Sequence, residues 1–219
     1  MEFDSLISKE FDSRKIQMLS TDASTLHFGR KMLIDYGIVA GSSTVIFVKA
    51  GQNGSVCGYK NKYIRLARKL NEKYGCTVIC SSNPYDGNNP LDNAFEIIED
   101  YIKGKNYTEY RLYYIGYSAG ATIGIKFAVN YTQIQRCLLV NAPLRNIGLI
   151  YKNVPNFKGE KLTFVYGAKD VSYSKIGLLE NLKTINNIQI STVEGADHHF
   201  SQNEDDFFLL PEKYLLYDI

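Results

Sequence analysis

Among its 219 residues the sequence has little net charge and no long apolar run. The 25 lysines and arginines are nearly balanced by 23 aspartates and glutamates, and the basic residues are scattered rather than clustered. This balance argues against partners such as nucleic acid or an acidic membrane surface. Because no apolar stretch approaches the roughly 20 residues that span a bilayer, we expect no membrane span.

Cysteine is also scarce, with four residues that show no metal-ligand spacing: Cys57, Cys76, Cys80 and Cys137. They lie in or beside apolar segments, which indicates reduced thiols in or near the core rather than a metal site. The first five residues are polar and acidic, so the sequence predicts no secretory signal and a cytoplasmic protein. Neither a metal ion nor an organic cofactor is expected.

The length and an ordinary hydrophobic content of 45% fit one domain that spans residues 1–219. Residues 1–43 form a polar N-terminal part with short strands expected near 16–19 and 31–34. From residue 44 on, apolar runs typical of strands buried on both faces alternate with helical patterns. This alternation predicts an α/β fold in which a mostly parallel central sheet has helices on both faces.

Five apolar runs and one alternating edge strand are the expected strands of residues 44–219. They cover residues 44–48, 77–80, 112–115, 137–140, 162–166 and, at the edge, 188–193. Helices are expected over 63–74, over 91–102, directly after residue 118, over 176–185, and as one or two short pieces from about residue 203. The sequence therefore places short loops at the carboxyl ends of the strands, where α/β sheets carry their sites.

The most informative motif is Gly116-Tyr117-Ser118-Ala119-Gly120, which stands between an expected strand and an expected helix. G-x-S-x-G on a sharp strand-to-helix turn presents an attacking serine, and the glycines let strand and helix approach closely. We expect Ser118 at the strained tip, where the N–H groups that begin the helix suit a developing oxyanion. A turn without a nucleophile, such as a phosphate-binding turn, is the alternative.

A serine hydroxyl needs a base to take its proton, and the base needs an acid to orient it. Asp170 follows the expected strand 162–166, and His198 follows the expected strand 188–193. Both residues are therefore predicted at the carboxyl ends of strands, as Ser118 is. The order Ser118, Asp170, His198 makes these residues the candidate catalytic triad.

With these residues in this order, the chain resembles the α/β-hydrolase family. The resemblance covers nearly the whole chain from about residue 44 and rests on the turn at Ser118, the acid turn 164–170 and the histidine loop 195–200. It implies the α/β-hydrolase fold, with the acid after the seventh strand and the histidine after the eighth. One strand between those of Ser118 and Asp170 separates their tips by roughly 10 Å, a gap that one imidazole fills.

Larger relatives in this family carry a helical lid between the strands that here end and begin near Leu144 and Lys161. In this sequence the same interval holds only a short connection, residues 145–155. The resemblance therefore implies no sizeable cap domain and an open site with at most a small flap, suited to a short or polymer-borne acyl group.

The base and the acid each have an alternative. His199 adjoins His198, and only one of them can be the base; the resemblance aligns His198 with the catalytic position. Asp170 has the alternative role of a helix cap, and Asp86 is an alternative acid on a segment that reads more naturally as a turn. Asp197 is expected to brace its loop.

The oxyanion hole requires two backbone N–H donors. Ala119, which follows the nucleophile, is expected to be one, and the resemblance maps the other onto Gln52 in the loop 49–55. Ala50 stands where the family often has histidine, so this loop departs from the pattern, and a flexible turn is the alternative. Tyr117, Asn53 and Tyr85 are expected to contact the substrate.

We therefore expect a small serine hydrolase that cleaves a carboxylic ester or thioester through an acyl-enzyme on Ser118. His198 is the expected base, and Asp170 is the acid that orients it. A serine peptidase or amidase, an acyltransferase, and a non-catalytic binding protein that keeps the fold are the alternatives. The sequence predicts neither the natural substrate nor the oligomeric state.

Overall fold

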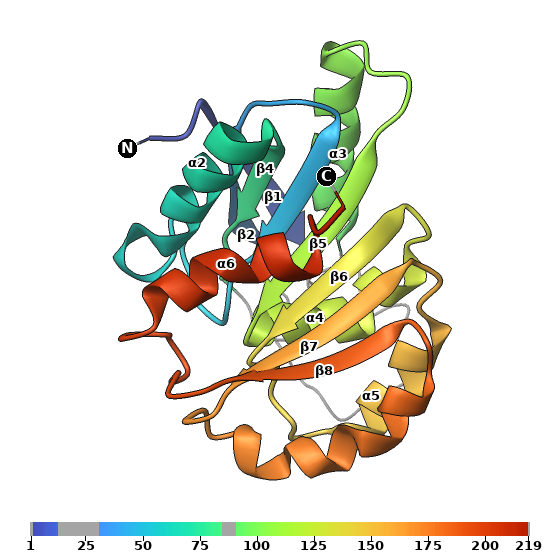
Figure 1. Ribbon diagram of the computed structural model, residues 1–219. Coiled ribbons are helices and arrows are strands. Elements are labelled where there is room, and N and C mark those ends of the chain that lie inside the picture. Colours follow the sequence, from blue (N-terminus) through green and yellow to red (C-terminus); the bar gives the residue numbers. More distant parts are fainter. Residues whose placement is uncertain (1, 13–30, 85–90, 219) are drawn as a thin grey trace.

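The computed structural model describes residues 2–12, 31–84 and 91–218. Its described strands form one sheet in the order β1-β2-β4-β3-β5-β6-β7-β8 (Figure 1). The strands are β1 (Ser5–Asp12), β2 (Lys31–Val39), β3 (Thr44–Lys49), β4 (Thr77–Ser81), β5 (Arg111–Tyr117), β6 (Ile134–Val140), β7 (Lys161–Gly167) and β8 (Ile188–Val193). Strand β2 pairs antiparallel with β1 and β4, whereas the pairs from β4 through β8 are parallel. The predicted mostly parallel sheet is confirmed.

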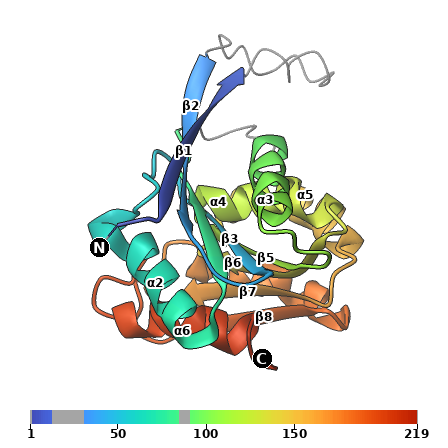
Figure 2. The ribbon, with the colours of Figure 1, turned by 90° about the horizontal axis from the view of Figure 1, so that it is seen from above.

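Helices cover both faces of the sheet, as Figure 2 shows from above. On one face α2 (Lys62–Tyr74) and α6 (Glu204–Tyr214) bury their apolar sides, including Leu66 and Phe207. On the other face lie α3 (Asp92–Gly104), α4 (Ala119–Lys126), α5 (Ile147–Asn153) and the 3₁₀ segment η4 (Tyr173–Thr184). Because both faces are covered, β3 to β7 consist almost entirely of buried residues.

The N-terminal part differs from the sequence-based expectation. Residues 5–12 were not expected to form a strand, but they pair along their whole length with β2, which extends the expected strand 31–34 to Val39. Apolar side chains such as Leu6 (63%) of β1 and Leu33 (62%) in the first half of β2 are exposed, so these parts lack the buried runs that mark the central strands. The second half of β2, residues 36–39, is buried. The strand expected near 16–19 lies outside the described residues.

The helix expected over 176–185 is instead a 3₁₀ segment, η4. Its expected apolar stripe repeats every three residues, at Ile176, Leu179, Leu182 and Ile185. That spacing matches the three residues per turn of a 3₁₀ helix better than the 3.6 of an α-helix. Leu179 and Leu182 are buried against the sheet, so tertiary packing maintains a 3₁₀ segment of unusual length.

One further expectation concerns the connection between β6 and β7, and another concerns helices that could span a membrane. Between β6 and β7 the chain forms only α5 and the short 3₁₀ segment η3 (Val154–Asn156), so this connection carries no sizeable cap, as predicted. Single 3₁₀ turns also occur at η1 (Tyr59–Asn61) and η2 (Ala128–Asn130). None of the described helices is both long and apolar enough to cross a bilayer.

The close approach of α4 to the sheet fixes where the chain turns at residue 118. A Cβ on Gly120 would lie 2.2 Å from the carbonyl oxygen of Lys49, and one on Gly116 would lie 2.5 Å from that of Gly120. Both contacts are with backbone atoms, which side-chain rotation cannot relieve. The two glycines of the motif are therefore required by the distance between helix and sheet.

We expect Gly120→Ala to lower the free energy of unfolding by about 3 kcal/mol, because the added methyl group must displace the backbone at the end of β3. Gly104→Ala, at the end of α3, is the control. A Cβ there meets nothing within 4 Å, so this change should be neutral or stabilising by up to about 1 kcal/mol. Urea unfolding of both variants tests this, and equal midpoints would contradict it.

Candidate active site

Ser118 occupies the tip of the turn between β5 and α4. Its φ of 53° and ψ of −114° place it outside the regions that residues with a Cβ normally adopt. Such a conformation costs about 1–3 kcal/mol. It is held by the Ser118 N–H, which donates to the carbonyl oxygen of Val140 at 2.8 Å, and by its carbonyl oxygen, which accepts from Thr122 at 3.2 Å.

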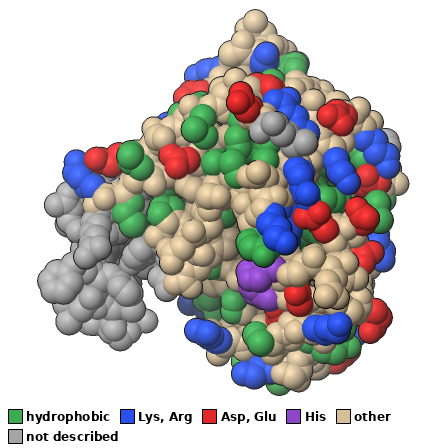
Figure 3. Space-filling view, turned by 90° about the vertical axis from the view of Figure 1, so that its left-hand side faces the viewer, with side chains coloured by type: hydrophobic (Ala, Val, Ile, Leu, Met, Phe, Trp, Pro, Cys, Tyr) green, Lys and Arg blue, Asp and Glu red, His purple; other side chains and the backbone are tan. Residues whose placement is uncertain are grey.

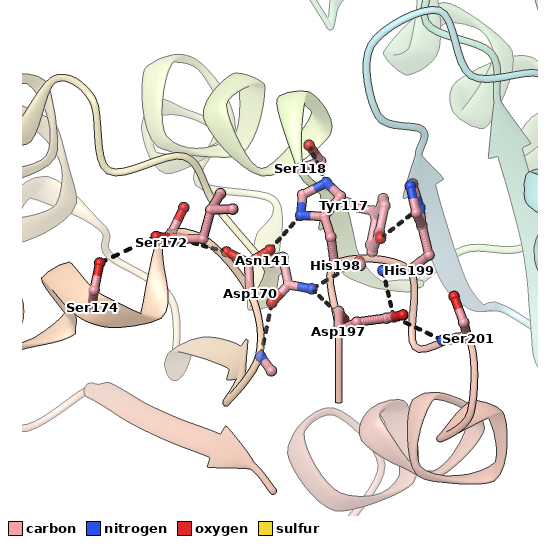
Figure 4. Close-up of polar contacts among 12 residues, drawn as sticks. Tyr117, Ser118, Asn141, Asp170, Ser172, Ser174, Asp197, His198, His199 and Ser201 are labelled. Carbon is pink, nitrogen blue, oxygen red and sulfur yellow. Dashed lines mark hydrogen bonds and ion pairs between the residues drawn. The ribbon is translucent and has the colours of Figure 1, made fainter. Parts of the chain in front are cut away.

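His198 bridges Ser118 and Asp170, as Figure 4 shows. Its Nε2 lies 3.1 Å from Ser118 Oγ, and its Nδ1 is hydrogen-bonded to Asp170 Oδ2. Because a carboxylate only accepts hydrogen bonds, Nδ1–H is the donor to Asp170, and Nε2 is then the acceptor for the serine hydroxyl. This is the proton arrangement in which an imidazole can remove the proton of Ser118.

Asp170 has a fully buried side chain whose two oxygens have different partners. One faces His198, and the other accepts the N–H of Ser172 at 2.7 Å. Burial raises the pKa of Asp170, but the hydrogen bonds from His198 and Ser172 outweigh it and hold that pKa below its ordinary value of 3.8. Asp170 thus braces the turn before η4 and also faces the imidazole, but the N-cap of η4 is Ser172 rather than Asp170.

Asn141 is a site residue that sequence reasoning did not identify. It follows β6 with a positive φ of 49° and is fully buried. Its Nδ2 donates to the carbonyl oxygen of His198 at 2.9 Å, and its Oδ1 accepts the N–H of Gly167 at 2.9 Å. One amide therefore joins the end of β7 to the histidine loop, residues 194–200. The available signal was a polar residue directly after a buried strand.

Two further side chains hold the histidine loop. Asp197 Oδ1 accepts the N–H groups of His199 at 3.0 Å and Ser201 at 2.8 Å, so the expected bracing role of Asp197 is confirmed. Lys62 is a second residue that the sequence did not reveal: its Nζ donates to the carbonyl oxygen of His199. The histidine loop is thus anchored by three side chains: Asp197 from the loop itself, Lys62 from α2 and Asn141 from the position after β6.

His199 has contacts different from those of His198. Its Nδ1 lies 3.4 Å from the Tyr117 hydroxyl, and its side chain is exposed. Partial burial, followed by the charges of His198 and Lys62, lowers the pKa of His199. Of the two neighbouring histidines, the structure therefore brings His198 to Ser118 and Asp170.

The residues expected to contact the substrate are placed differently from one another. Tyr117 is 7% exposed and packs edge-on against Tyr63 and Phe207, beneath the two histidines. Asn53 is exposed, with a φ of 54°, in a turn closed by the Gly54 N–H and the carbonyl oxygen of Gly51. Tyr85 and the alternative acid Asp86 lie outside the described residues.

The loop after β3 passes directly beside the serine. A Cβ on Gly51 would lie 3.3 Å from that of Ser118, so the adjacent residue Gln52 begins close to the site. Asn83 holds this loop through its Nδ2, which donates to the carbonyl oxygen of Ala50, and through its N–H, which donates to that of Gly54. Ala119 is the first residue of α4, where N–H groups have no partner within the helix.

All four cysteines are free thiols, and Cys76, Cys80 and Cys137 are buried, which confirms the prediction of reduced core residues. Burial raises the pKa of Cys76 to about 11, so its thiol stays protonated at neutral pH. Within the described residues, no group of three or more histidine, cysteine, aspartate or glutamate side chains is arranged to hold a metal ion.

Solved structures with a similar fold span most of this chain. Est1E from Butyrivibrio proteoclasticus aligns with a TM-score of 0.63 at 10% identity, over 85% of this chain and 94% of its own. FphF, a fluorophosphonate-binding serine hydrolase of Staphylococcus aureus, gives 0.59 at 14%, over 93% and 95%. An α/β serine hydrolase without a lid from Xanthomonas campestris gives 0.56 at 13%, over 83% and 87%.

No protein-family model and no curated protein matches the sequence. The structural likeness therefore rests on the arrangement of the chain rather than on sequence identity. The likeness in fold is consistent with three features described above: the sheet order, the helices on both faces and the turn at Ser118. The protein has the α/β-hydrolase fold.

Proposed function

We propose that the protein is a serine hydrolase that cleaves a carboxylic ester or thioester through an acyl-enzyme on Ser118. The observation that supports this most directly is the unbroken hydrogen-bond path from Ser118 Oγ through both ring nitrogens of His198 to Asp170. A serine held at a strained turn next to an imidazole with a buried carboxylate behind it has the three parts that nucleophilic catalysis needs.

In the first half of the proposed reaction, Ser118 Oγ attacks the carbonyl carbon while His198 Nε2 takes the hydroxyl proton. Asp170 stabilises the resulting imidazolium through Nδ1–H. The negative charge that develops on the carbonyl oxygen faces the N–H groups of Ala119 and Gln52, each worth about 3–4 kcal/mol by comparison with measured donors. His198 then gives its proton to the leaving oxygen or sulfur, and the acyl group remains on Ser118.

In the second half, His198 removes a proton from water, whose oxygen attacks the acyl carbon. The bond from that carbon to Ser118 Oγ then breaks as His198 returns the proton to Oγ, and the acid is released. Asn141, Asp197 and Lys62 act in both halves as positioning residues, because they fix the loop that carries the imidazole. Asn53 and Tyr85 remain proposed substrate contacts. For Tyr117 the buried position favours support of the histidine rings over direct contact with substrate.

The small connection between β6 and β7 supports a substrate that approaches from open solvent, such as a short or polymer-borne acyl group. Hydrolysis is favoured over a binding role without catalysis because Ser118 keeps a costly conformation. The names of FphF and of the Xanthomonas protein, both serine hydrolases, agree with this proposal.

We expect a fluorophosphonate probe to label the wild-type protein on Ser118 and to leave Ser118→Ala unlabelled. Ser174→Ala is the matched control: the hydroxyl of Ser174, in η4, donates to the carbonyl oxygen of Val171, and its loss should leave labelling intact. Gel fluorescence and mass spectrometry of the labelled peptide provide the measurement. Labelling that persists in Ser118→Ala would defeat the assignment of the nucleophile, and an unlabelled wild type would favour the non-catalytic alternative.

His198→Ala should lower kcat for a small acyl ester roughly 10⁴-fold or more, because the serine loses its base. His199→Ala should retain activity within about tenfold, since His199 contacts neither Ser118 nor Asp170. Initial rates over a series of acyl esters and thioesters test both variants. The reverse ranking would make His199 the base.

The same substrates separate the enzymatic alternatives. Cleavage of aminoacyl amides without cleavage of esters would identify a peptidase. Transfer of the acyl group to an added alcohol faster than to water would identify an acyltransferase. The proposal requires that ester or thioester hydrolysis exceed both.

Asp170 gives a prediction about stability and pH. Its pKa is lower in the folded protein than the ordinary 3.8, so the ionised carboxylate stabilises the fold above that pH. This contribution is lost as the pH falls through the folded-state pKa. We therefore expect the difference in unfolding free energy between wild type and Asp170→Asn to shrink on acidification below 3.8, measured by urea titration. A difference that is constant or grows on acidification would contradict this.

A further inference from the structure

We propose that Tyr59 and His199 form a binding surface for an aromatic leaving group, next to the base of the triad. This inference rests on the proposed function and deepens it, because it names the class of alcohol or thiol that the enzyme releases. The surface lies on the face shown in Figure 3, where the site histidines reach solvent among lysine, arginine and apolar side chains.

The rings of His199 and Tyr59 follow on from the ring of His198, so the three aromatic rings form a row that starts at the proposed base. The ring of His199 lies 5.1 Å from that of His198, and the ring of Tyr59 lies 5.4 Å from that of His199, tilted by 31°. Tyr59 is 54% exposed, although large aromatic side chains gain most when buried. A half-exposed ring pair beside a nucleophile thus leaves an aromatic face open to a ligand.

The backbone holds Tyr59 in this position with strain. Gly58, Lys60 and Asn61 have positive φ values of 74°, 51° and 60°, so three residues around Tyr59 adopt the left-handed region. Lys60 and Asn61 do so despite carrying a Cβ. Hydrogen bonds from the N–H of Asn61 to Gly58 and from that of Gly58 to Ser55 maintain the turn. The turn leads into α2, where the N–H of Tyr63 donates to the carbonyl oxygen of Cys57, and it also places the exposed ring of Tyr59 against His199.

The ring of His199 is held in place and is uncharged, so it can form a flat surface for a ligand ring. The Tyr117 hydroxyl meets its Nδ1 from below, and Lys62 binds its carbonyl oxygen. Burial and the nearby positive charges lower the pKa of His199, so the ring is neutral at neutral pH. An aromatic ring therefore meets a neutral imidazole rather than a hydrated cation.

The position of the surface relative to the base assigns it to the leaving group. His198 Nε2 must lie near the leaving oxygen to return the proton, whereas the oxyanion points toward Ala119 and the loop at Gln52. The ring centres of His198 and His199 are 5.1 Å apart, a separation that a ring joined to the leaving oxygen through one carbon can span. Lys60, an exposed side chain whose Nζ lies 5.4 Å from the Tyr59 ring centre, is free of burial constraints and can move aside.

The test compares benzyl acetate with cyclohexylmethyl acetate, which share the acyl group and have leaving alcohols of similar size and reactivity. We expect Tyr59→Leu to lower the kcat/KM ratio of the benzyl over the cyclohexylmethyl ester by about two- to tenfold, the range for one aromatic pair. Tyr59→Phe should keep the ratio. Tyr217→Leu, which removes a tyrosine of similar exposure (56%) next to Arg136, should also keep it.

Ethyl benzoate and ethyl cyclohexanecarboxylate form the second pair, which places the ring in the acyl group. The inference is overturned if Tyr59→Leu leaves the benzyl ratio unchanged, or if it alters only the acyl-side ratio. Fluorophosphonate labelling of every variant separates the two proposals. If the variants are labelled but the ratio is unchanged, only the proposed aromatic surface is refuted. If the wild type neither takes the label nor cleaves the esters, the proposed function is refuted as well.

Discussion

The close contact between the start of α4 and the end of β3 is the constraint on which the site depends. Gly116 and Gly120 lack the side chains that would push helix and sheet apart, and only at this separation does the chain turn sharply enough to expose Ser118. The strain at Ser118 is balanced by the packing of α4, whose Ala121, Ile123 and Ile125 are buried. Ser118 is therefore held at the start of a helix whose core-facing residues are buried.

The imidazole is positioned by a different device. His198 sits on a loop without regular structure, and polar side chains hold that loop by its carbonyl and N–H groups. Asn141 is central among them, because its amide contacts both the histidine loop and Gly167 at the end of β7. Since Asp170 follows Gly167 by three residues, Asn141 couples the position of Asp170 to that of His198.

The sequence was sufficient to predict the central strands because burial on both faces leaves continuous apolar runs. It was insufficient to predict β1, whose pairing with β2 buries few apolar side chains. It was also insufficient to predict the 3₁₀ form of η4, although the three-residue repeat was visible. The order of Ser118, Asp170 and His198, together with the family resemblance, was sufficient to select residues that the fold brings together. Asn141 and Lys62 had no comparable signal, because their partners are backbone atoms of a distant loop.

The position of β8 at the edge of the sheet has a consequence for the relation between activity and folding. Only Ile188 is buried in β8, whereas every residue of β5 after Arg111 is buried. Edge strands with few buried contacts open at lower free-energy cost than central strands, so heat or denaturant loosens β8 and the loop behind it before β5. His198 then separates from Ser118 while Ser118 is still in place. Under the proposed function, loss of turnover reports this local opening rather than unfolding of the whole protein.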